Sequence, residues 1–495
     1  MNTITIAWIA LPFFVGFLIY LLPRLDRYLA ILATLGSIGY CFWIFYQEPS
    51  LFVDLIDNFG TTFLSLTLLD NFGVTLEVDT TSIFFILTNA IVTTAVVIYC
   101  WDTDKTAFFY SQIIILHGSV NSAFICSDFI SLYVALEVIS IAAFLAIAYP
   151  RSDRTMWVAL RYLFISNVAM LFYLIGAVLV YKANHSFVFT GLPAAPPEAL
   201  ALIFLGLLIK GGVFISGCWL PLTHSESETP VSAMLSGVAV KSGIFPLLRC
   251  AVVLEEVNPI IRFFGVASAI LGVFYCIFEK DTKRTLAFST ISQLGFILAA
   301  PEVGGFYALT HGLVKSALFL IAGNLPSRKF SDLQQQPMTT PFWLALAIAS
   351  FSISGFPLLS GFGAKVLTMK NLLPWQAIGM NVAALGTAIV YAKFIFLPHQ
   401  NQGEGKQGRR GFWIAITFLL MGLIAANIAY YDAYNIANIV KPLATIALGW
   451  LVYWFGLRRL TLQLPREIEQ FNNLVGLMSL ILIVLFWMGF AWLDV

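Results

Sequence analysis

Apolar runs of about 20 residues recur along this chain from one end to the other. A helix of that length spans the hydrocarbon core of a bilayer, where every backbone N–H and C=O group must be paired within the protein. The 495 residues are 59% hydrophobic and 11% charged, against about 25% charged residues in soluble domains. We therefore expect an all-α polytopic membrane protein.

Marking these runs gives sixteen candidate spans. The short run 285–300 and an interruption within 340–372 leave that number open by one or two. The runs lie near residues 4–22, 28–46, 80–100, 107–125, 129–149, 158–181, 197–218, 231–253, 258–277, 285–300, 303–323, 340–358, 374–397, 411–430, 435–457 and 471–491.

Lys and Arg residues are concentrated in alternate loops between the runs, such as 101–106 and 278–284. This bias marks cytoplasmic loops, so we expect both termini to face outward. The segment 47–79 carries six acidic residues and neither Lys nor Arg, which fits an external loop. Its alternating FLSLTLL and VTLEV pieces predict a small β-hairpin.

Composition and motifs exclude several function classes. The net charge of +1 gives no support for nucleic-acid binding, and the six cysteines lie singly without metal-site or disulfide spacing. The chain lacks a G-x-G-x-x-G after a strand, a cysteine cluster for iron–sulfur and a P-loop. We therefore expect no cofactor, no metal and no redox catalysis in this chain.

Ionisable residues inside the apolar runs are the candidate functional groups, because a charge in a bilayer costs several kcal/mol. Two structural explanations are ion pairs that hold helices together and lysines that extend to the membrane surface. So many such residues in one apolar chain favour a conducting line of sites instead. They are Glu137, Lys210, Lys241, His311, Lys315, Lys365 and Lys393, of which Lys393 is the one that best fits extension to the surface.

Two of these lysines stand at interruptions of an apolar run. Lys210 is followed directly by Gly211 and Gly212. The second interruption precedes Lys365 and contains Gly355, Pro357, Gly361 and Gly363. Such breaks occur where the backbone lines a protein-enclosed cavity, and paired breaks in two halves of a transporter indicate its ion sites.

The spacing of the lysines predicts a repeat. Lys241 follows Lys210 by 31 residues, and Lys393 follows Lys365 by 28 residues. Units of five spans that begin near 107 and 258 have odd length, so the two units would lie in opposite orientations. The expected organisation is N-terminal spans with the acidic loop, a first inverted repeat, a second inverted repeat and C-terminal spans, with boundaries 1–103, 104–255, 256–400 and 401–495.

Several motifs resemble the antiporter-like membrane subunits shared by Mrp-type multisubunit sodium/proton antiporters and respiratory complex I. They include LYVALEVISIAAF, LPLTHSESETPVSAMLSG, ISQLGF and PLLSGF, within a match that runs from about 80 to 430. The chain is most similar to the D-type Mrp subunit. The resemblance implies a 14-span core with inverted five-helix repeats and two broken helices, followed here by about two extra C-terminal spans.

The resemblance also assigns roles. Glu137 and Lys210 would form a coupled pair, and Lys365 would be the distal lysine. The central relay would consist of Lys241, His311 and Lys315. His224, in the turn PLTHSESETP, would either give protons access from the cytoplasmic side or stabilise the turn.

Two residues depart from the family pattern. Leu136 precedes Glu137 where the family often has an aromatic residue, and Glu228 adds a charge where the family usually has Ala–Pro. The extra C-terminal spans have no assignable chemistry, and both docking to a neighbouring subunit and plain packing would explain them.

The expected function is proton translocation within a multisubunit cation/proton antiporter in a bacterial inner membrane. Its partners would be other membrane subunits, and its ions H⁺ and Na⁺. The alternative is a proton-pumping subunit of a complex I-like NAD(P)H or ferredoxin dehydrogenase or of a carbon-uptake complex. A structural scaffold and a self-sufficient transporter are further rivals; neither the exchanged cation nor the host complex follows from the sequence.

Overall fold

A computed structural model describes residues 2–47, 62–68, 74–401, 408–459, 462 and 464–492. Within these residues, thirteen helices are long and apolar enough to cross a membrane. Each of the sixteen predicted runs contains a helix, although those near 107–125, 285–300 and 340–358 are not among the thirteen. The predicted all-α polytopic architecture is therefore confirmed.

In the N-terminal part, the described residues form three α-helices and a hairpin. Asp79 begins the third helix, because its carboxylate accepts from the Ser82 backbone N–H at 2.6 Å. The antiparallel hairpin confirms the prediction for the FLSLTLL and VTLEV pieces, whereas most of 47–61 lies outside the described residues. The elements are α1 (Asn2–Leu21), α2 (Asp26–Gln47), β1 (Thr62–Thr67), β2 (Thr75–Asp79) and α4 (Thr80–Tyr99).

The two predicted repeat units each contain five helical segments, and the fourth segment is broken in both. The first unit contains α5 (Ala107–Ala123), α6 (Phe129–Ala148), α7 (Asp153–Asn184), α8 (Pro197–Gly211) with α9 (Leu220–Glu226), and α10 (Thr229–Met234) with α11 (Lys241–Val253). The second contains α12 (Asn258–Phe278), α13 (Thr282–Ala299), α14 (Gly304–Ala322), α16 (Thr340–Ser354) with α17 (Ser360–Lys370), and α18 (Ala377–Ile395).

The remaining α-helices and strands are not among the five helical segments of either repeat unit. They are α15 (Phe330–Leu333), α19 (Arg410–Ala429), α20 (Ile436–Phe455), α21 (Phe471–Trp492) and a parallel pair of two-residue strands, β3 (Met338–Thr339) and β4 (His399–Gln400).

Both predicted helix breaks are present. The residue after α8 is Gly212 with φ +66°, and the residue after α16 is Gly355 with φ +86°. Glycine adopts this left-handed conformation without the steric cost of a Cβ, so it is well suited to end a helix. Each break contains a second residue with positive φ that is not glycine, Phe214 in one and Leu358 in the other.

A third irregularity was not predicted. A π-helical turn, Leu235–Ala239, separates α10 from α11 and directly precedes Val240 and Lys241. Such wide turns are rare inside helices and are frequent at functional sites. Its sequence, LSGVA, gives no signal that distinguishes it from an ordinary helical turn.

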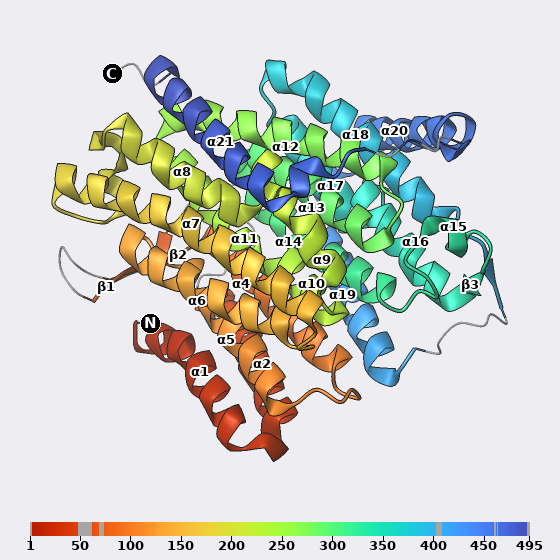
Figure 1. Ribbon diagram of the computed structural model, residues 1–495, viewed down its shortest axis with the longest axis horizontal. Helices are drawn as coiled ribbons and strands as arrows, with labels where there is room; N and C mark the ends of the chain where they lie inside the picture. The colour runs from red at the N-terminus through yellow and green to blue at the C-terminus, as the bar shows by residue number, and fades with distance from the viewer. Residues whose placement is uncertain are drawn as a thin grey trace.

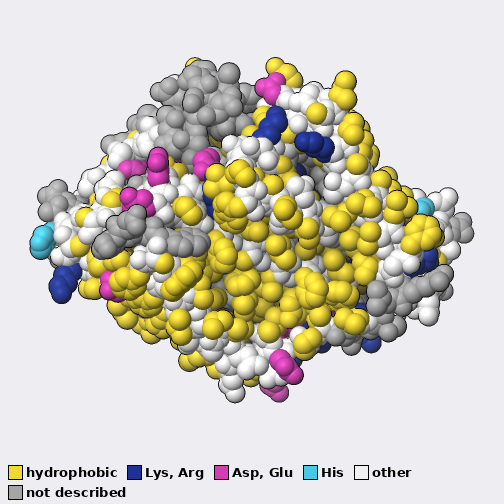
Figure 2. All heavy atoms as spheres, turned by 90° about the horizontal axis from the view of Figure 1, so that it is seen from above, with side chains coloured by type: hydrophobic (Ala, Val, Ile, Leu, Met, Phe, Trp, Pro, Cys, Tyr) yellow, Lys and Arg dark blue, Asp and Glu magenta, His cyan; other side chains and the backbone are white. Residues whose placement is uncertain are grey.

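Helix α14 lies at the centre of the molecule, where every one of its residues is buried (Figure 1). It packs against α4, α13 and α19, whereas α1, α20 and α21 lie at the edge. Figure 2 shows a broad hydrophobic face with acidic and basic side chains at its margins, as expected of a surface in contact with lipid. The polar residues of α14 are therefore remote from this surface.

The C-terminal segment folds back on the chain. Helix α21 packs along α8, and Glu469 just before it accepts from Arg284 at 2.5 Å. The Arg161 guanidinium donates to the backbone carbonyl of the same glutamate. One face of α21 therefore packs within the chain, while Trp487 and Phe490 on the other face are exposed.

Helices α8 and α11 approach closely beside the first break. A methyl group at Gly243 would overlap the backbone nitrogen of Gly211, and it would lie 2.7 Å from the carbonyl oxygen of Leu207. The contact thus requires glycine on α11.

We expect Gly243→Ala to destabilise the protein by about 1–3 kcal/mol, because overpacking forces two backbones apart. The measurement is the midpoint of thermal unfolding in detergent micelles. Gly39→Ala on α2 is the matched control, since no heavy atom lies within 4 Å of a methyl group there. Equal midpoints for the two variants would contradict the close-approach argument.

Candidate functional site

Lys210 is buried in the last turn of α8, directly before the first break. Its ammonium donates to the Leu136 carbonyl on α6 at 3.1 Å and to the hydroxyls of Ser140 on α6 and Ser166 on α7, the latter at 2.8 Å. Three acceptors satisfy the three donors of an ammonium group. The lysine therefore joins α8 to α6 and α7 without a direct ion pair.

Glu137 is the residue after Leu136, and it is half-buried. It forms none of the ion pairs found within 4.0 Å in the described part of the chain, although it is an electrostatic neighbour of Lys210. Glu137 lies between the exposed side chains of Val134 and Ile141 on one stripe of α6. Its carboxylate is thus near the outer surface of this chain, at the level of the first broken helix.

Lys241 is fully buried and follows the π-helical turn. Its ammonium donates to the carbonyls of Gly237 at 2.5 Å and Ser236 at 3.3 Å, both within that wide turn. Gly312 on α14 faces the same ammonium, since a methyl group there would lie 3.5 Å from it. The wide turn therefore supplies oxygen partners for the lysine where α11 meets α14.

His311 and Lys315 lie one helical turn apart on α14, as predicted. Lys315 donates to the Leu286 carbonyl on α13 at 2.8 Å and to the Tyr391 hydroxyl on α18 at 3.2 Å. Neither ring nitrogen of His311 has a hydrogen-bond partner among the described residues, and its electrostatic neighbours are Lys241 and Lys315. The predicted central relay residues are therefore brought together between α11 and α14.

Two sets of polar side chains extend from Lys315 across α13, α14 and α18; we call them the polar ladder. In the first set, the Tyr391 hydroxyl is 2.9 Å from the Ser289 hydroxyl. In the second, the Tyr307 hydroxyl donates to Gln293 at 2.6 Å, and the Gln293 amide donates to Thr387 at 3.3 Å. The two sets are one helical turn apart on α13 and α18 because their residues differ by four positions.

Lys365 lies beyond the second set of the polar ladder, on α17. Its ammonium has no hydrogen-bond partner in the described part of the chain and lies 5.4 Å from the centre of the Phe296 ring. Phe296 in turn stacks on Tyr307 with ring centres 5.6 Å apart. The glycine at the second break makes room for this lysine, since a methyl group at Gly355 would lie 2.9 Å from the Lys365 Cδ.

The other glycine and proline residues of the second break have separate roles. Gly361 approaches the Ser352 carbonyl too closely to accommodate a Cβ, whereas Gly363 faces Tyr430. Pro357 lies between the two helices, where its missing N–H removes no helical hydrogen bond.

His224 was expected in a turn, but it lies in the last turn of α9 and is fully buried. Its ring stacks on Phe319 with centres 4.7 Å apart, and both ring nitrogens lack a hydrogen-bond partner within the described ranges. Phe319 lies four residues after Lys315, so it is on the same face of α14 as His311 and Lys315. The ring is thus held by burial and stacking, and both roles named for His224, proton access and stabilisation of the local fold, stay predictions.

Lys393 differs from the other lysines. Its ammonium donates to the carbonyls of Cys276, Ile277 and Glu279, which end α12, with the shortest distance 2.5 Å to Glu279. A cation at a helix C-terminus satisfies unpaired carbonyls and interacts favourably with the helix dipole. Lys393 therefore caps α12 and does not continue the line of relay residues.

The sequence reasoning missed the polar ladder. A signal was present in α13, where Thr285, Ser289, Thr290, Ser292 and Gln293 give an apolar run an unusual density of hydrogen-bonding side chains. The hydroxyl of Tyr391 was not identifiable, because tyrosine is common in membrane helices and its partner Lys315 is 76 residues away.

A second buried polar cluster was also missed. The ring nitrogens of His117 on α5 contact the Ser37 hydroxyl at 2.8 Å and the Thr93 hydroxyl at 3.2 Å, and Asn89 donates to Asn121 at 2.7 Å. The cluster joins α2, α4 and α5 by interhelical hydrogen bonds. Because both ring nitrogens are satisfied, His117 holds helices together, in contrast to His311.

Comparison with known proteins places these features in a family. Residues 126–390 match the family described as NADH:quinone oxidoreductase/Mrp antiporter, TM. Residues Glu137, Lys210, Lys241, His311, Lys315 and Lys365 all fall within this range.

Two curated relatives carry different names. The chain is 26% identical over 435 residues to NAD(P)H-quinone oxidoreductase chain 4 1 of Synechococcus sp. (strain JA-3-3Ab), covering 80% of this chain and 81% of the relative. It is also 26% identical over 440 residues to the D-type subunit of the Na(+)/H(+) antiporter of Alkalihalophilus pseudofirmus (strain ATCC BAA-2126 / JCM 17055 / OF4), covering 82% and 88%.

The fold resembles a solved structure, that of the Mrp complex from Dietzia sp. DQ12-45-1b. The TM-score is 0.75 at 22% identity, over 97% of this chain and 59% of that one. The family match covers more than half of the chain, and it agrees with the resemblance carried by the motifs. The chain therefore belongs to the NADH:quinone oxidoreductase/Mrp antiporter transmembrane family.

Proposed function

We propose that this chain translocates protons as one membrane subunit of a multisubunit cation/proton antiporter of the Mrp type, in a bacterial plasma membrane. The observation that carries the proposal is the group of buried ionisable residues Lys241, His311, Lys315 and Lys365 in the central helices, with the polar ladder lying between Lys315 and Lys365. The D-type antiporter subunit of Alkalihalophilus pseudofirmus, which the chain matches over most of its length, supports the Mrp assignment.

The line is built from groups that can exchange protons. Lys241 and His311 meet where α11 contacts α14, and Lys315 connects to the first set of the polar ladder through Tyr391. The second set leads towards Lys365 through Tyr307 and Phe296. Polar side chains of this kind hold bridging water, through which a proton moves without an open pore.

The residues at the two ends of the proposed proton path, Glu137 and Lys365, are placed to exchange protons with groups outside the path. Glu137 lies near the outer surface of α6, where a neighbouring membrane subunit would cover it, and Lys210 connects it to α8 through the Leu136 carbonyl. At the other end, the Lys365 ammonium has no hydrogen-bond partner among the residues that the structure describes. His224 lies beside the α14 face and is our candidate for proton access from the cytoplasmic side.

In the proposed mechanism, protons move because each lysine alternates between a charged and a neutral form. A lysine is neutral after it gives up its proton and charged after it takes one, and a charged group disfavours protonation of its neighbours. Charge would therefore move by stepwise displacement along the line. Inverted repeats with one broken helix each would place access to opposite membrane sides at the two ends.

A second candidate function is proton pumping in a complex I-like NAD(P)H or ferredoxin dehydrogenase or a carbon-uptake complex. The relative named NAD(P)H-quinone oxidoreductase chain 4 1 favours it, with a similar extent of match. The two functions differ in partners and driving force while the path within this chain stays the same.

Purification of the tagged chain from its native membrane tests the host complex. For the antiporter we expect small membrane subunits to copurify, and vesicles to exchange protons for added Na⁺. Copurification of redox subunits, with proton uptake that depends on a reduced electron donor and not on Na⁺, would instead establish the second candidate.

We expect Glu137→Ala to abolish proton flux while the chain still assembles, because its carboxylate is the acidic neighbour of Lys210. The measurement is flux in inverted vesicles together with the amount of assembled complex. The control is Glu255→Gln, an exposed acidic residue at the start of a helix. Wild-type flux in Glu137→Ala would remove Glu137 from the path.

Lys315→Ala should stop turnover, since it removes the link between His311 and the polar ladder. Lys315→Arg should also reduce flux by about 100-fold or more, because a guanidinium stays protonated and cannot pass its proton on. Lys370→Arg, an exposed substitution at the end of α17, is the matched control. If Lys315→Arg ran at the wild-type rate, Lys315 would act only as a fixed charge.

A further inference from the structure

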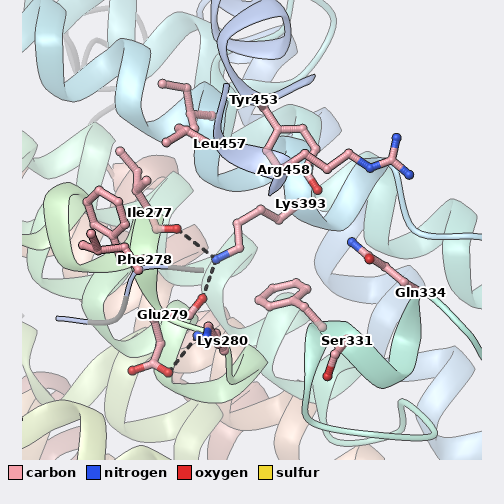
Figure 3. A pocket seen from close by; sticks show the side chains of 13 residues that line it. Ile277, Phe278, Glu279, Lys280, Ser331, Gln334, Lys393, Tyr453, Leu457 and Arg458 are labelled. Carbon is pink, nitrogen blue, oxygen red and sulfur yellow. Dashed lines mark hydrogen bonds between the residues drawn. The ribbon is translucent and has the colours of Figure 1, made fainter. Parts of the chain in front are cut away.

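A pocket opens where the ends of α12 and α20 meet α18 and the segment around α15 (Figure 3). It has a volume of about 180 Å³. Lys393 extends into it from α18 towards the end of α12, while Arg458 and Gln334 lie on the opposite side. The proposed proton path does not use this pocket, because the Lys393 ammonium is held by three backbone carbonyls.

The charged side chains of the pocket are predominantly basic. Among the described residues, Lys280, Lys393 and Arg458 line it together with one acidic residue, Glu279. The Glu279 carboxylate is committed elsewhere, because it accepts from Arg284 at 2.9 Å and lies 3.6 Å from Arg466. Burial alone would raise the pKa of Glu279, but the Arg284 guanidinium outweighs it and the pKa is lowered. The pocket therefore presents a net positive charge.

The polar groups of the pocket include a neutral hydrogen-bond donor besides the cations. The amide of Gln334, just after α15, lies on its wall, whereas the Ser331 hydroxyl donates to Asp332 at 2.9 Å. A phosphate group has several acceptor oxygens and prefers a site with both cations and neutral donors. The volume of the pocket suits a small headgroup.

The other wall of the pocket is apolar and adjoins the lipid-facing side of the molecule. Tyr453 and Leu457 line it at the end of α20, and the neighbouring Trp454 and Phe455 are 47% and 78% exposed. Aromatic residues of this kind mark the membrane–water boundary. The basic loop 278–284 was predicted to face the cytoplasm, where anionic lipids attract basic clusters. Acyl chains can thus extend along α20 while a headgroup occupies the pocket.

We propose that this pocket binds the phosphate headgroup of an anionic phospholipid, with Lys280 and Arg458 as its cationic contacts. Lys393, whose ammonium stays on the carbonyls at the end of α12, adds its positive charge to the site. The bound lipid fastens α20 to α12 and α18. The site is independent of the proton path, so its test does not depend on the proposed function. A free phosphate ion shares the headgroup chemistry and is distinguished by a separate arm of the test.

The test compares lipid retention by the full chain, purified with its accompanying subunits and studied by native mass spectrometry. Vesicles of phosphatidylglycerol, vesicles of phosphatidylcholine and inorganic phosphate are the three probes. The double variant Lys280→Gln/Arg458→Gln leaves the α12 cap by Lys393 in place. Lys329→Gln, an exposed substitution in the adjacent loop, is the matched control.

We expect the wild type and the control to retain phosphatidylglycerol in preference to phosphatidylcholine, and the double variant to lose about tenfold or more of that retention. Thermal unfolding of the wild type, but not of the double variant, should shift upward with phosphatidylglycerol. Equal retention in the double variant and the control would overturn the site. Displacement of phosphatidylglycerol by millimolar inorganic phosphate would identify a free anion instead of the lipid.

Discussion

Charged groups in this protein lie in a solvent that cannot hydrate them, and the rest of the architecture follows from how each group is satisfied. A bilayer offers no hydrogen bonds, so a buried ammonium must find oxygen atoms within the protein. Lys210 and Lys315 each use one carbonyl of a regular helix together with side-chain hydroxyls on neighbouring helices. Lys241 and Lys393 take their oxygens from irregular places, the π-helical turn and the end of α12.

The same constraint separates two kinds of buried polar group. His117 and Lys393 have all their polar contacts within the chain, and they hold helices in place. His311, His224 and Lys365 are among the buried residues whose polar atoms have no hydrogen-bond partner in the described residues. A buried polar group without a partner is costly unless water completes it, and this supports the proposal that the proton path runs through these residues.

Close helix packing holds this arrangement together. Gly243 lets α11 contact the first break, and Gly312 and Gly237 let α14 approach the π-helical turn. The central helix α14 is enclosed on all sides, while the outer helices face lipid on one side. The polar groups of α14 thus belong to the buried centre, and the pocket at the end of α20 belongs to the lipid-facing periphery.

The sequence alone determined the spans, both helix breaks and the ionisable residues inside the membrane. These features depend on local patterns: the length of an apolar run, the conformational freedom of glycine beside a lysine, and the rarity of charge in hydrocarbon. The motifs also determined the family. Only the tertiary structure decided which groups share contacts. Lys315 is hydrogen-bonded to Tyr391, which is 76 residues away in the sequence. Lys210 donates to the carbonyl of Leu136, which is 74 residues away. The π-helical turn and the capping role of Lys393 likewise depend on neighbours from other helices, because a hydrogen-bond partner is chosen by packing geometry that no local pattern records.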